Sequence, residues 1–202
     1  MLINRNTKII GQRAILVPYK VEHVLKYHNW MQSEELQRLT ASIPLTLEEE
    51  YEMQKSWMID QNKCTFIILD KEKFENSRNE IESMIGDTNL FFANADDRLC
   101  AEAEIMIAET WARGRKCGSE ATLLMLLYGI EILGVRQFIV KIADDNSVSI
   151  HMFASFGFTE ISRSSAFKEI TFSKIVDEGW VTWLKNNVGH YEMIIDDTDD
   201  PE

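Results

Sequence analysis

The fold of this chain is decided by residues 146–158, NSVSIHMFASFGF, which have the pattern N-x-x-S-x-x-x-F-x-x-x-G-F. Asn146 follows a run typical of a strand, and Ser147 or Ser149 can cap the helix that comes next. Gly157 can end this helix in the left-handed conformation before another strand starts. A strand, a capped helix and a second strand in this order predict alternating α/β structure in the second half of the chain.

On both sides of this segment, apolar residues recur with periods that are typical of strands and of helices in alternation. Polar turns are expected at 76–79 and 94–97. Strands are expected at residues 13–17, 64–69, 84–92, 101–108, 137–142, 158–162 and 168–175. Helices are expected within 21–39 (one or two helices), from a capping box at Thr46 to about 59, and at 118–133, 147–156 and 180–188. This order predicts an α/β (α+β) fold with one central mixed sheet flanked by helices.

The composition is that of one folded, acidic domain. The chain has 202 residues, with 21 Lys and Arg against 33 Asp and Glu and a formal net charge of -12. Nucleic acids and anionic membranes bind basic surfaces, so neither is expected as a partner. Residues 1–190 are expected to form a single domain, and residues 191–202 are expected to form a disordered acidic C-terminal tail.

Cysteine usage and the length of the apolar runs indicate a soluble, cytoplasmic protein. The cysteines Cys64, Cys100 and Cys117 are odd in number and too widely spaced for a disulfide framework or a zinc site. A reducing compartment and no metal are therefore expected. The most apolar run, residues 123–130, is far shorter than the roughly 20 residues of a membrane helix, and the N-terminus has no signal-peptide core.

A basic loop, residues 113–119 with the sequence RGRKCGS, lies between an expected strand and an expected helix. Backbone amides and the positive end of a helix can hold phosphate at such a position. Three cations within four residues also give an acidic chain the local positive charge that a polyphosphate ligand needs. From charge alone, an ordinary basic turn explains the segment equally well.

Together, the segments at 113–118 and 146–158 resemble the GCN5-related N-acetyltransferase (GNAT) superfamily, whose acetyl-CoA loop has the form Q/R-x-x-G-x-G/A. The N-acetyltransferase 9 subfamily is the closer match, on SEELQRLTAS at 33–42, GDTNLF at 86–91 and MIAE at 106–109. The resemblance covers nearly the whole chain before the acidic tail. It implies the GNAT acyl-CoA N-acyltransferase fold and direct transfer of an acetyl group from acetyl-CoA, the co-substrate, to an amine.

The resemblance also implies where acetyl-CoA binds. The strand that ends at Met106, Ile107 and Ala108 pairs with the pantetheine arm, and a backbone amide near this end holds the tetrahedral oxyanion. The pyrophosphate binds the loop formed by Arg113, Gly114, Arg115, Lys116, Cys117, Gly118 and Ser119. The further cofactor-binding residues are Asn146, Ser149 and Phe153, with Asn146 and Phe153 near the thioester.

Two residues depart from the family pattern and bear on activity. Lys116 stands where the loop pattern has its first glycine, and a left-handed backbone there would cost roughly 1 kcal/mol or more. With ordinary dihedral angles, its amide would still point at phosphate and its side chain would add charge. Phe153 stands where many relatives have a tyrosine that protonates the leaving thiolate, so another group or water must supply that proton. The cations beside Cys117 can lower its thiol pKa, but direct transfer leaves no covalent role for it.

Two carboxylates on the strand expected at 101–108 are candidates for the general base. Alternation places Glu102, Glu104 and Met106 on one face of this strand. Glu104 lies two residues from the strand end where the acetyl group is expected. It is our first choice as general base or as the carboxylate that positions the amine, and Glu102 is the second. A solvated acidic face is the alternative interpretation of both residues.

The pKa values of amines favour an N-terminal α-amine as the acceptor. An α-amine with a pKa near 8 is partly neutral at physiological pH, whereas a lysine near 10.4 is only about one-thousandth neutral. The subfamily resemblance implies the same acceptor class, the N-termini of α- and β-tubulin. Two alternatives stay open. One is a weakly active or inactive GNAT-fold protein that binds and stabilises microtubules, and the other is a small-polyamine acetyltransferase, which rests on the acidic composition alone.

Overall fold

The computed structural model describes residues 2–93 and 98–195, and their strands form one nine-stranded sheet. The strands are β1 (Thr7–Ile10), β2 (Ala14–Pro18), β3 (Lys63–Asp70), β4 (Met84–Phe91), β5 (Cys100–Ile107), β6 (Gln137–Ala143), β7 (Thr159–Ser164), β8 (Glu169–Ile175) and β9 (Glu192–Ile195). They lie in the order β7-β8-β6-β5-β4-β3-β2-β1-β9, and each described neighbour pair is antiparallel except β5 with β6. The predicted single mixed sheet is confirmed.

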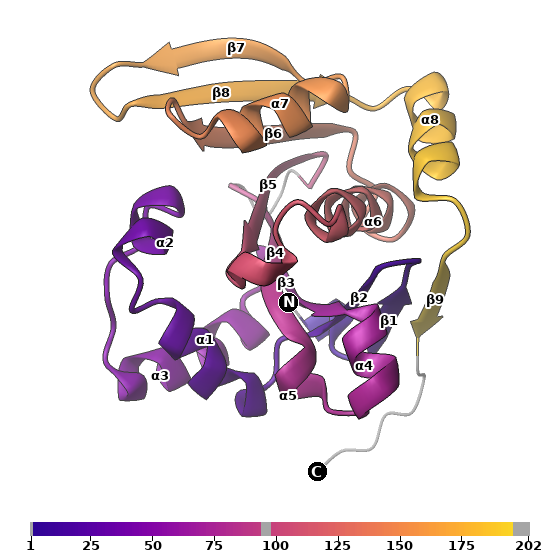
Figure 1. The fold of residues 1–202 in the computed structure, drawn as a ribbon. Coiled ribbons are helices and arrows are strands. Elements are labelled where there is room, and N and C mark those ends of the chain that lie inside the picture. Colours follow the sequence, from indigo (N-terminus) through magenta and orange to yellow (C-terminus); the bar gives the residue numbers. More distant parts are fainter. Residues whose placement is uncertain (1, 94–97, 196–202) are drawn as a thin grey trace.

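Helices cover both faces of this sheet, as predicted; in Figure 1, α1, α2 and α3 lie together at the left and α6 and α8 at the right. The helices are η1 (Leu2–Asn4), η2 (Val21–His23), α1 (Val24–Trp30), α2 (Glu34–Leu39), α3 (Leu47–Ile59), α4 (Lys71–Ser77), α5 (Glu80–Ser83), η3 (Thr110–Ala112), α6 (Cys117–Glu131), α7 (Ser147–Ser155) and α8 (Glu178–Val188), where η marks a 3-10 helix. The core on one face contains Leu126 of α6, Phe153 of α7 and Leu184 of α8. The core on the other face contains Tyr27 of α1 and Leu36 of α2.

The starts of the helices follow from local sequence. The predicted capping box opens α3, because the Thr46 hydroxyl accepts a hydrogen bond from the Glu49 amide while the Glu49 carboxylate accepts one from the Thr46 amide at 2.8 Å. At α7 the cap is Asn146, whose side chain accepts from the Ser149 amide at 3.2 Å, rather than a serine. Asn and Ser are equally good caps, so the pattern alone did not separate them. Gly157 has a φ of 86°, the left-handed helix end that the pattern predicts.

Two four-residue strands, β1 and β9, are not evident from the sequence pattern. They pair with each other, with Thr7 opposite Ile195 and Ile10 opposite Glu192. Four residues show too little alternation to identify a strand, and the two partners lie near opposite ends of the sequence. The sheet therefore extends to Ile195, which corrects the expected domain boundary at residue 190. Residues 196–202 of the expected tail, like the expected turn at 94–97, lie outside the described residues.

The first half of the chain contains more short helices than the pattern predicts. The turn expected at 76–79 joins α4 to α5; Asp70 caps α4 by accepting a hydrogen bond from the Lys73 amide at 2.9 Å, and Arg78 ends it with a φ of 54°. The segment expected to hold one or two helices at 21–39 contains η2, α1 and α2. None of the described helices is long and apolar enough to cross a membrane.

The sheet opens between β5 and β6. Residues 100–102 pair with residues 137–139, whereas β5 continues to Ile107 and β6 to Ala143 beyond these pairs. On their other sides both strands stay paired, β5 with β4 and β6 with β8. The later halves of β5 and β6 therefore border a gap in the sheet.

The end of β5 is shaped by the close approach of β4. The Ile85 carbonyl accepts hydrogen bonds from the amides of both Ala108 and Glu109, at 2.8 and 3.2 Å, so the chain bulges out of the regular ladder after β5. Gly86 lies beside this bulge, where a Cβ would be 1.9 Å from the carbonyl oxygen of Met106. Glycine allows the two strands to come this close.

Candidate active site

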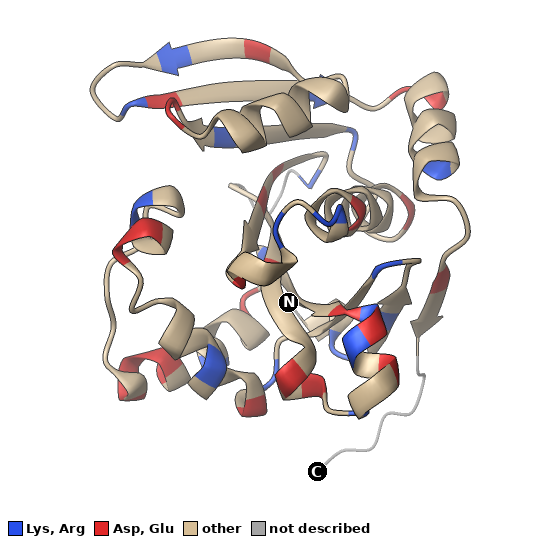
Figure 2. Cartoon of the chain, in the orientation of Figure 1, with Lys and Arg blue, Asp and Glu red and all other residues tan. Residues whose placement is uncertain are grey.

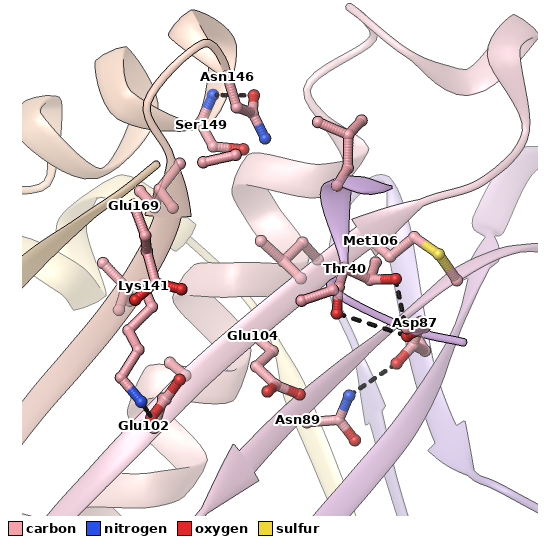
Figure 3. Close-up of a pocket in the computed structure, with 18 of the residues that line it drawn as sticks. Thr40, Asp87, Asn89, Glu102, Glu104, Met106, Lys141, Asn146, Ser149 and Glu169 are labelled. Atoms are coloured by element: carbon pink, nitrogen blue, oxygen red, sulfur yellow. Dashed lines mark hydrogen bonds and ion pairs between the residues drawn. The ribbon is translucent and has the colours of Figure 1, made fainter. Parts of the chain in front are cut away.

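A cavity of about 320 Å³ lies where the sheet opens. Its walls come from the loop after α2, from β4, β5 and β6, from the start of α7 and from the β7–β8 hairpin. Figure 3 shows the polar side chains that reach it from these elements. Because two strand edges border the gap, an extended ligand can lie along them as an added strand would.

The structure brings six of the residues predicted for the site to this one cavity. They are Glu102, Glu104, Met106, Asn146, Ser149 and Phe153. The loop at 113–119 lies beyond the cavity, next to the end of β5, where Arg113 Nε donates a hydrogen bond to the Ile107 carbonyl at 3.1 Å. The predicted residues therefore form two adjoining groups, one in the cavity and one at the start of α6.

The two predicted carboxylates have different environments. Glu102 Oε2 lies 2.6 Å from Lys141 Nζ, and this hydrogen bond raises the pKa of the lysine. The Glu104 side chain is 49% exposed and lies 3.8 Å from Lys63 Nζ. A carboxylate held by a lysine at hydrogen-bond distance is a weaker proton acceptor. Glu104 is therefore better placed than Glu102 to meet an amine.

A third carboxylate in the cavity, Asp87 on β4, is not singled out by the sequence pattern. It is 3% exposed and accepts a hydrogen bond from Asn89 Nδ2 at 2.8 Å. Burial raises the pKa of Asp87 to about 7; Lys63 and the Asn89 hydrogen bond oppose this shift, and Glu104 adds to it. The signal that could have identified it is the polar run from Asp87 through Thr88 to Asn89 in a central strand, because buried polar groups need partners or a function.

The loop before α6 carries the three predicted cations (Figure 2), and two of them are paired with acids. Arg113 lies 3.1 Å from Glu35 of α2, and Arg115 lies 3.2 Å from Glu72. Lys116 forms no ion pair with any described residue, and its φ is 66°. A lysine thus adopts the backbone conformation that favours glycine, at the N-cap of a 15-residue helix. The available ammonium and the helix amides together suit a phosphate group.

Packing and conformation explain both glycines of this loop. A Cβ at Gly118 would lie 3.0 Å from a side-chain carbon at the end of β5, and Gly114 has a φ of 75°. Cys117 is buried, and burial raises the pKa of its thiol, with Asp70 raising it further. The neighbouring Arg115 lowers this pKa, as expected of a cation, but burial outweighs it. The loop is built for contact through its backbone and cations rather than for thiol chemistry.

Phe153 of α7 is a buried part of the cavity wall. It is 2% exposed, and its ring packs edge-on against Phe158 with the ring centroids 5.2 Å apart. The side chain has no proton to donate. Any proton that the leaving group takes must come from elsewhere.

The end of α2 and the loop after it, residues 38–42, form one wall of the cavity. Arg38 Nη1 lies 2.6 Å from Asp145 Oδ2, which ties this wall to the loop before α7. Phe167 in the β7–β8 hairpin also lines the cavity and is 82% exposed. An exposed aromatic ring at the mouth of the cavity can contact an acceptor chain.

Glu22, His23 and Glu80 form the one group of described residues whose potential metal-ligand atoms lie within 4.8 Å of one another. Both ring nitrogens of His23 are already used. Nδ1 accepts a hydrogen bond from the Lys20 amide at 3.1 Å, and Nε2 lies 2.8 Å from Glu80 Oε1. Hydrogen bonding accounts for this cluster without an ion.

Comparisons with known proteins agree with this geometry. An acetyltransferase (GNAT) domain matches residues 13–159. The N-acetyltransferase 9-like protein of Nematostella vectensis is 55% identical over 172 residues, which cover 85% of this chain and 87% of the relative. The alpha/beta-tubulin-N-acetyltransferase 9 of Drosophila melanogaster is 50% identical over 192 residues, which cover 93% of this chain and 96% of the relative.

A solved acetyltransferase structure shares the fold of this chain. The crystal structure of spermidine N-acetyltransferase from Vibrio cholerae in complex with CoA and spermine matches with a TM-score of 0.69 at 17% identity, over 82% of this chain and 96% of that one. This likeness concerns the fold, whereas the matches at about half identity span most of both sequences. The chain therefore belongs to the GNAT family and is an acetyltransferase.

Proposed function

We propose that this enzyme transfers the acetyl group of acetyl-CoA to the N-terminal α-amine of a protein, with α- or β-tubulin as the candidate acceptor. The observation that carries the proposal is the cavity at the opening between β5 and β6, where carboxylates from three strands, β4, β5 and β8, lie beside two open strand edges. Relatives named alpha/beta-tubulin-N-acetyltransferase 9 support the choice of acceptor.

Acetyl-CoA fits the two groups of residues that the structure brings next to each other. The amides of the pantetheine arm can pair with the open edges of β5 and β6 in the manner of an added strand. The pyrophosphate fits at the start of α6, where helix amides and the Lys116 ammonium are available. Arg113 can contribute there by exchanging its ion pair with Glu35 for one with phosphate.

The Ile107 amide is the proposed donor to the oxyanion. The next amide, that of Ala108, already donates to the Ile85 carbonyl inside the sheet. Successive amides of a strand point to opposite sides, so the Ile107 amide faces the open edge. A fixed amide at this position stabilises the negative charge that forms when the amine attacks the thioester carbon.

Glu104 acts on the incoming amine, whereas Phe153 determines how the sulfur leaves. The half-exposed Glu104 carboxylate attracts and positions the ammonium form of the acceptor at the cavity wall. Phe153 gives the departing sulfur no proton. A thiol has a pKa near 8.5, so the sulfur can leave as a thiolate near neutral pH and take its proton from water.

The acidity of the cavity favours one other acceptor, a small polyamine. Four carboxylates line the cavity, from Asp87, Glu102, Glu104 and Glu169. However, Lys141 and Lys63 lie close to two of them, at 2.6 and 3.8 Å, which weakens the attraction for a polycation. We therefore rank the α-amine first.

The remaining alternative is a GNAT-fold protein that binds microtubules with little turnover. Phe153 favours this alternative, because its side chain has no proton to give to the leaving sulfur.

Mass spectrometry of acetyl transfer tests the proposal with three acceptors. They are a tubulin N-terminal peptide with a free α-amine, the same peptide with a blocked α-amine and an added lysine, and spermidine. Acetylation of the first alone is expected, with a higher KM for the peptide in Glu104→Gln. Acetylation of spermidine alone would support the polyamine alternative. Acetyl-CoA binding without transfer to any acceptor would support the non-catalytic one.

A further inference from the structure

Asp87 is a buried carboxylate in the active-site cavity to which the reaction above assigns no step. It lies in the middle of β4, opposite Ile67 of β3 on one side and Met106 of β5 on the other. Figure 3 shows its side chain beside Asn89, with Glu104 on the neighbouring strand. Burying a carboxylate in the centre of a sheet is strongly unfavourable unless it is paired or uncharged. Packing alone would favour an apolar residue here.

Hydrogen bonds hold the Asp87 carboxylate so that one oxygen is satisfied and the other is not. The Thr65 hydroxyl donates to Asn89 Oδ1, which turns the Asn89 amide nitrogen toward Asp87. Asn89 Nδ2 then donates to Asp87 Oδ2 at 2.8 Å. Asp87 Oδ1 is buried and has no hydrogen-bond partner among the described residues. One oxygen of the fixed carboxylate is therefore available to accept a proton.

The charged and titratable groups around Asp87 come from β3, β5, α1 and the loop after β2. Lys63 of β3 lowers its pKa, whereas Glu104 of β5 raises it. The phenols of Tyr19 and Tyr27 also lie near, and burial raises the pKa of both well above 10, so both stay neutral at physiological pH. Burial is the largest effect on Asp87 and places its pKa at about 7. The group can thus exchange a proton near neutral pH.

We propose that Asp87 is the catalytic proton acceptor, which takes a proton from the acceptor ammonium through Oδ1, directly or through one water, while Glu104 positions that ammonium. The inference rests on the proposed function, since it requires an amine in the cavity. Glu104 is the exposed carboxylate that meets the charged amine first, and Asp87 is the buried one that removes its charge.

The step balances in protons and electrons. The ammonium nitrogen loses one proton to Asp87 Oδ1, and its freed lone pair forms the C–N bond to the thioester carbon. The C–S bond breaks, and the sulfur leaves with the bonding electrons. The nitrogen loses a second proton as the amide forms, the thiolate gains one through water, and Asp87 releases its own proton to solvent. The sum is one amide, one CoA thiol and one free proton.

The pKa of Asp87 also selects the class of amine. Transfer from an α-ammonium, with a pKa of about 7.7–8.0, to a carboxylate near 7 is unfavourable by only about tenfold. An ordinary aspartate near 3.9 would face a factor of about ten thousand, and a lysine donor near 10.4 would face a factor above one thousand even with Asp87. This difference in pKa favours an N-terminal α-amine over a lysine.

The pH dependence of kcat tests this role in three variants. With a saturating α-amine peptide, kcat of the wild type is expected to rise about tenfold per pH unit below pH 7 and then level off. In Asp87→Asn, this rising limb of the pH profile is expected to disappear, and kcat is expected to fall by a factor of about 10²–10⁴. Glu50→Gln is the matched control, because Glu50 is also a buried carboxylate but does not line the cavity; it should keep the limb. Glu104→Gln is expected to move the limb to lower pH, since Glu104 raises the pKa of Asp87.

A carbon-13 NMR titration of the aspartate carboxyl groups of the wild type gives a readout that does not need activity. One aspartate of the free wild-type protein is expected to titrate near pH 7, and Asp87→Asn to remove that signal. The absence of any aspartate titrating above about pH 5.5 would overturn the inference. So would an Asp87→Asn enzyme with kcat within about threefold of the wild type. A wild type that acetylates no α-amine would instead overturn the proposed function, and the role of Asp87 with it.

Discussion

Replacing Asp87 with asparagine is expected to stabilise the folded protein at high pH much more than at low pH. The side chain is buried, and its pKa in the folded state is about 7, against 3.8 for the ordinary group. The folded state therefore holds a proton that the unfolded chain releases between about pH 4 and 7. The stability that this proton contributes is fully present below pH 4 and is lost as the pH rises through 7.

Three pKa units at about 1.36 kcal/mol each give a total of about 4 kcal/mol, of which about 2–3 kcal/mol falls between pH 5 and pH 8. Asparagine has nearly the same shape and does not titrate. The free energy of unfolding of Asp87→Asn, relative to that of the wild type, should therefore increase by about 2–3 kcal/mol from pH 5 to pH 8. Urea unfolding followed by tryptophan fluorescence measures it.

Asp145→Asn is the control for this measurement, because Asp145 is an exposed carboxylate on the surface. Its difference from the wild type should change by less than about 0.5 kcal/mol over the same pH range. If the difference in the free energy of unfolding between Asp87→Asn and the wild type stays constant from pH 5 to pH 8, the pKa of Asp87 is not raised in the folded state. Such a result would mean that Asp87 titrates alike in the folded and unfolded states.

Three further substitutions follow from the geometry of the cofactor site. Lys116→Gly should stabilise the fold by about 1 kcal/mol in thermal unfolding because φ is 66°, whereas Lys116→Ala should not; both should weaken acetyl-CoA binding alike. Glu35→Gln should free Arg113 and lower the Kd for CoA about two- to fivefold in calorimetry, whereas Glu34→Gln, on the same helix, should leave it unchanged. Gly86→Ala should destabilise the fold by about 1–3 kcal/mol and weaken CoA binding, because its Cβ would meet a strand carbonyl at 1.9 Å. Equal stability of Lys116→Gly and Lys116→Ala would contradict a strained backbone at this position. Equal Kd values for CoA in Glu34→Gln and Glu35→Gln would contradict a role of Arg113 in binding. A Gly86→Ala variant as stable as the wild type would contradict the close approach of the two strands.

Elements whose residues carry their own local signal could be predicted from the sequence. The capping box at Thr46 and the pattern from Asn146 to Gly157 identify α3 and α7, because the cap residues hydrogen bond to amides only a few positions away. In contrast, β1 and β9 exist because they pair with each other across nearly the whole chain. Periodicity within four residues does not contain that information.

The residues of the candidate site also fall into those that a local pattern marks and those that depend on the tertiary structure. Glu104, Asn146 and Phe153 could be nominated because a strand period and a family pattern point to them, and all three line the cavity. Neither signal points to Asp87; only its place in a polar run of an expected strand could have marked it, because its chemistry arises from burial between two neighbouring strands. The opening of the sheet also depends on where two strands stop pairing, and the left-handed backbone at Lys116 depends on the path of the loop.

A crystal structure of the complex with acetyl-CoA would show whether the cofactor binds in the opening between β5 and β6. We expect the pantetheine arm to lie between the later halves of β5 and β6, with the thioester oxygen at the Ile107 amide and the pyrophosphate at the start of α6 beside Lys116. Acetyl-CoA bound elsewhere, or β5 and β6 paired along their full length, would contradict this expectation.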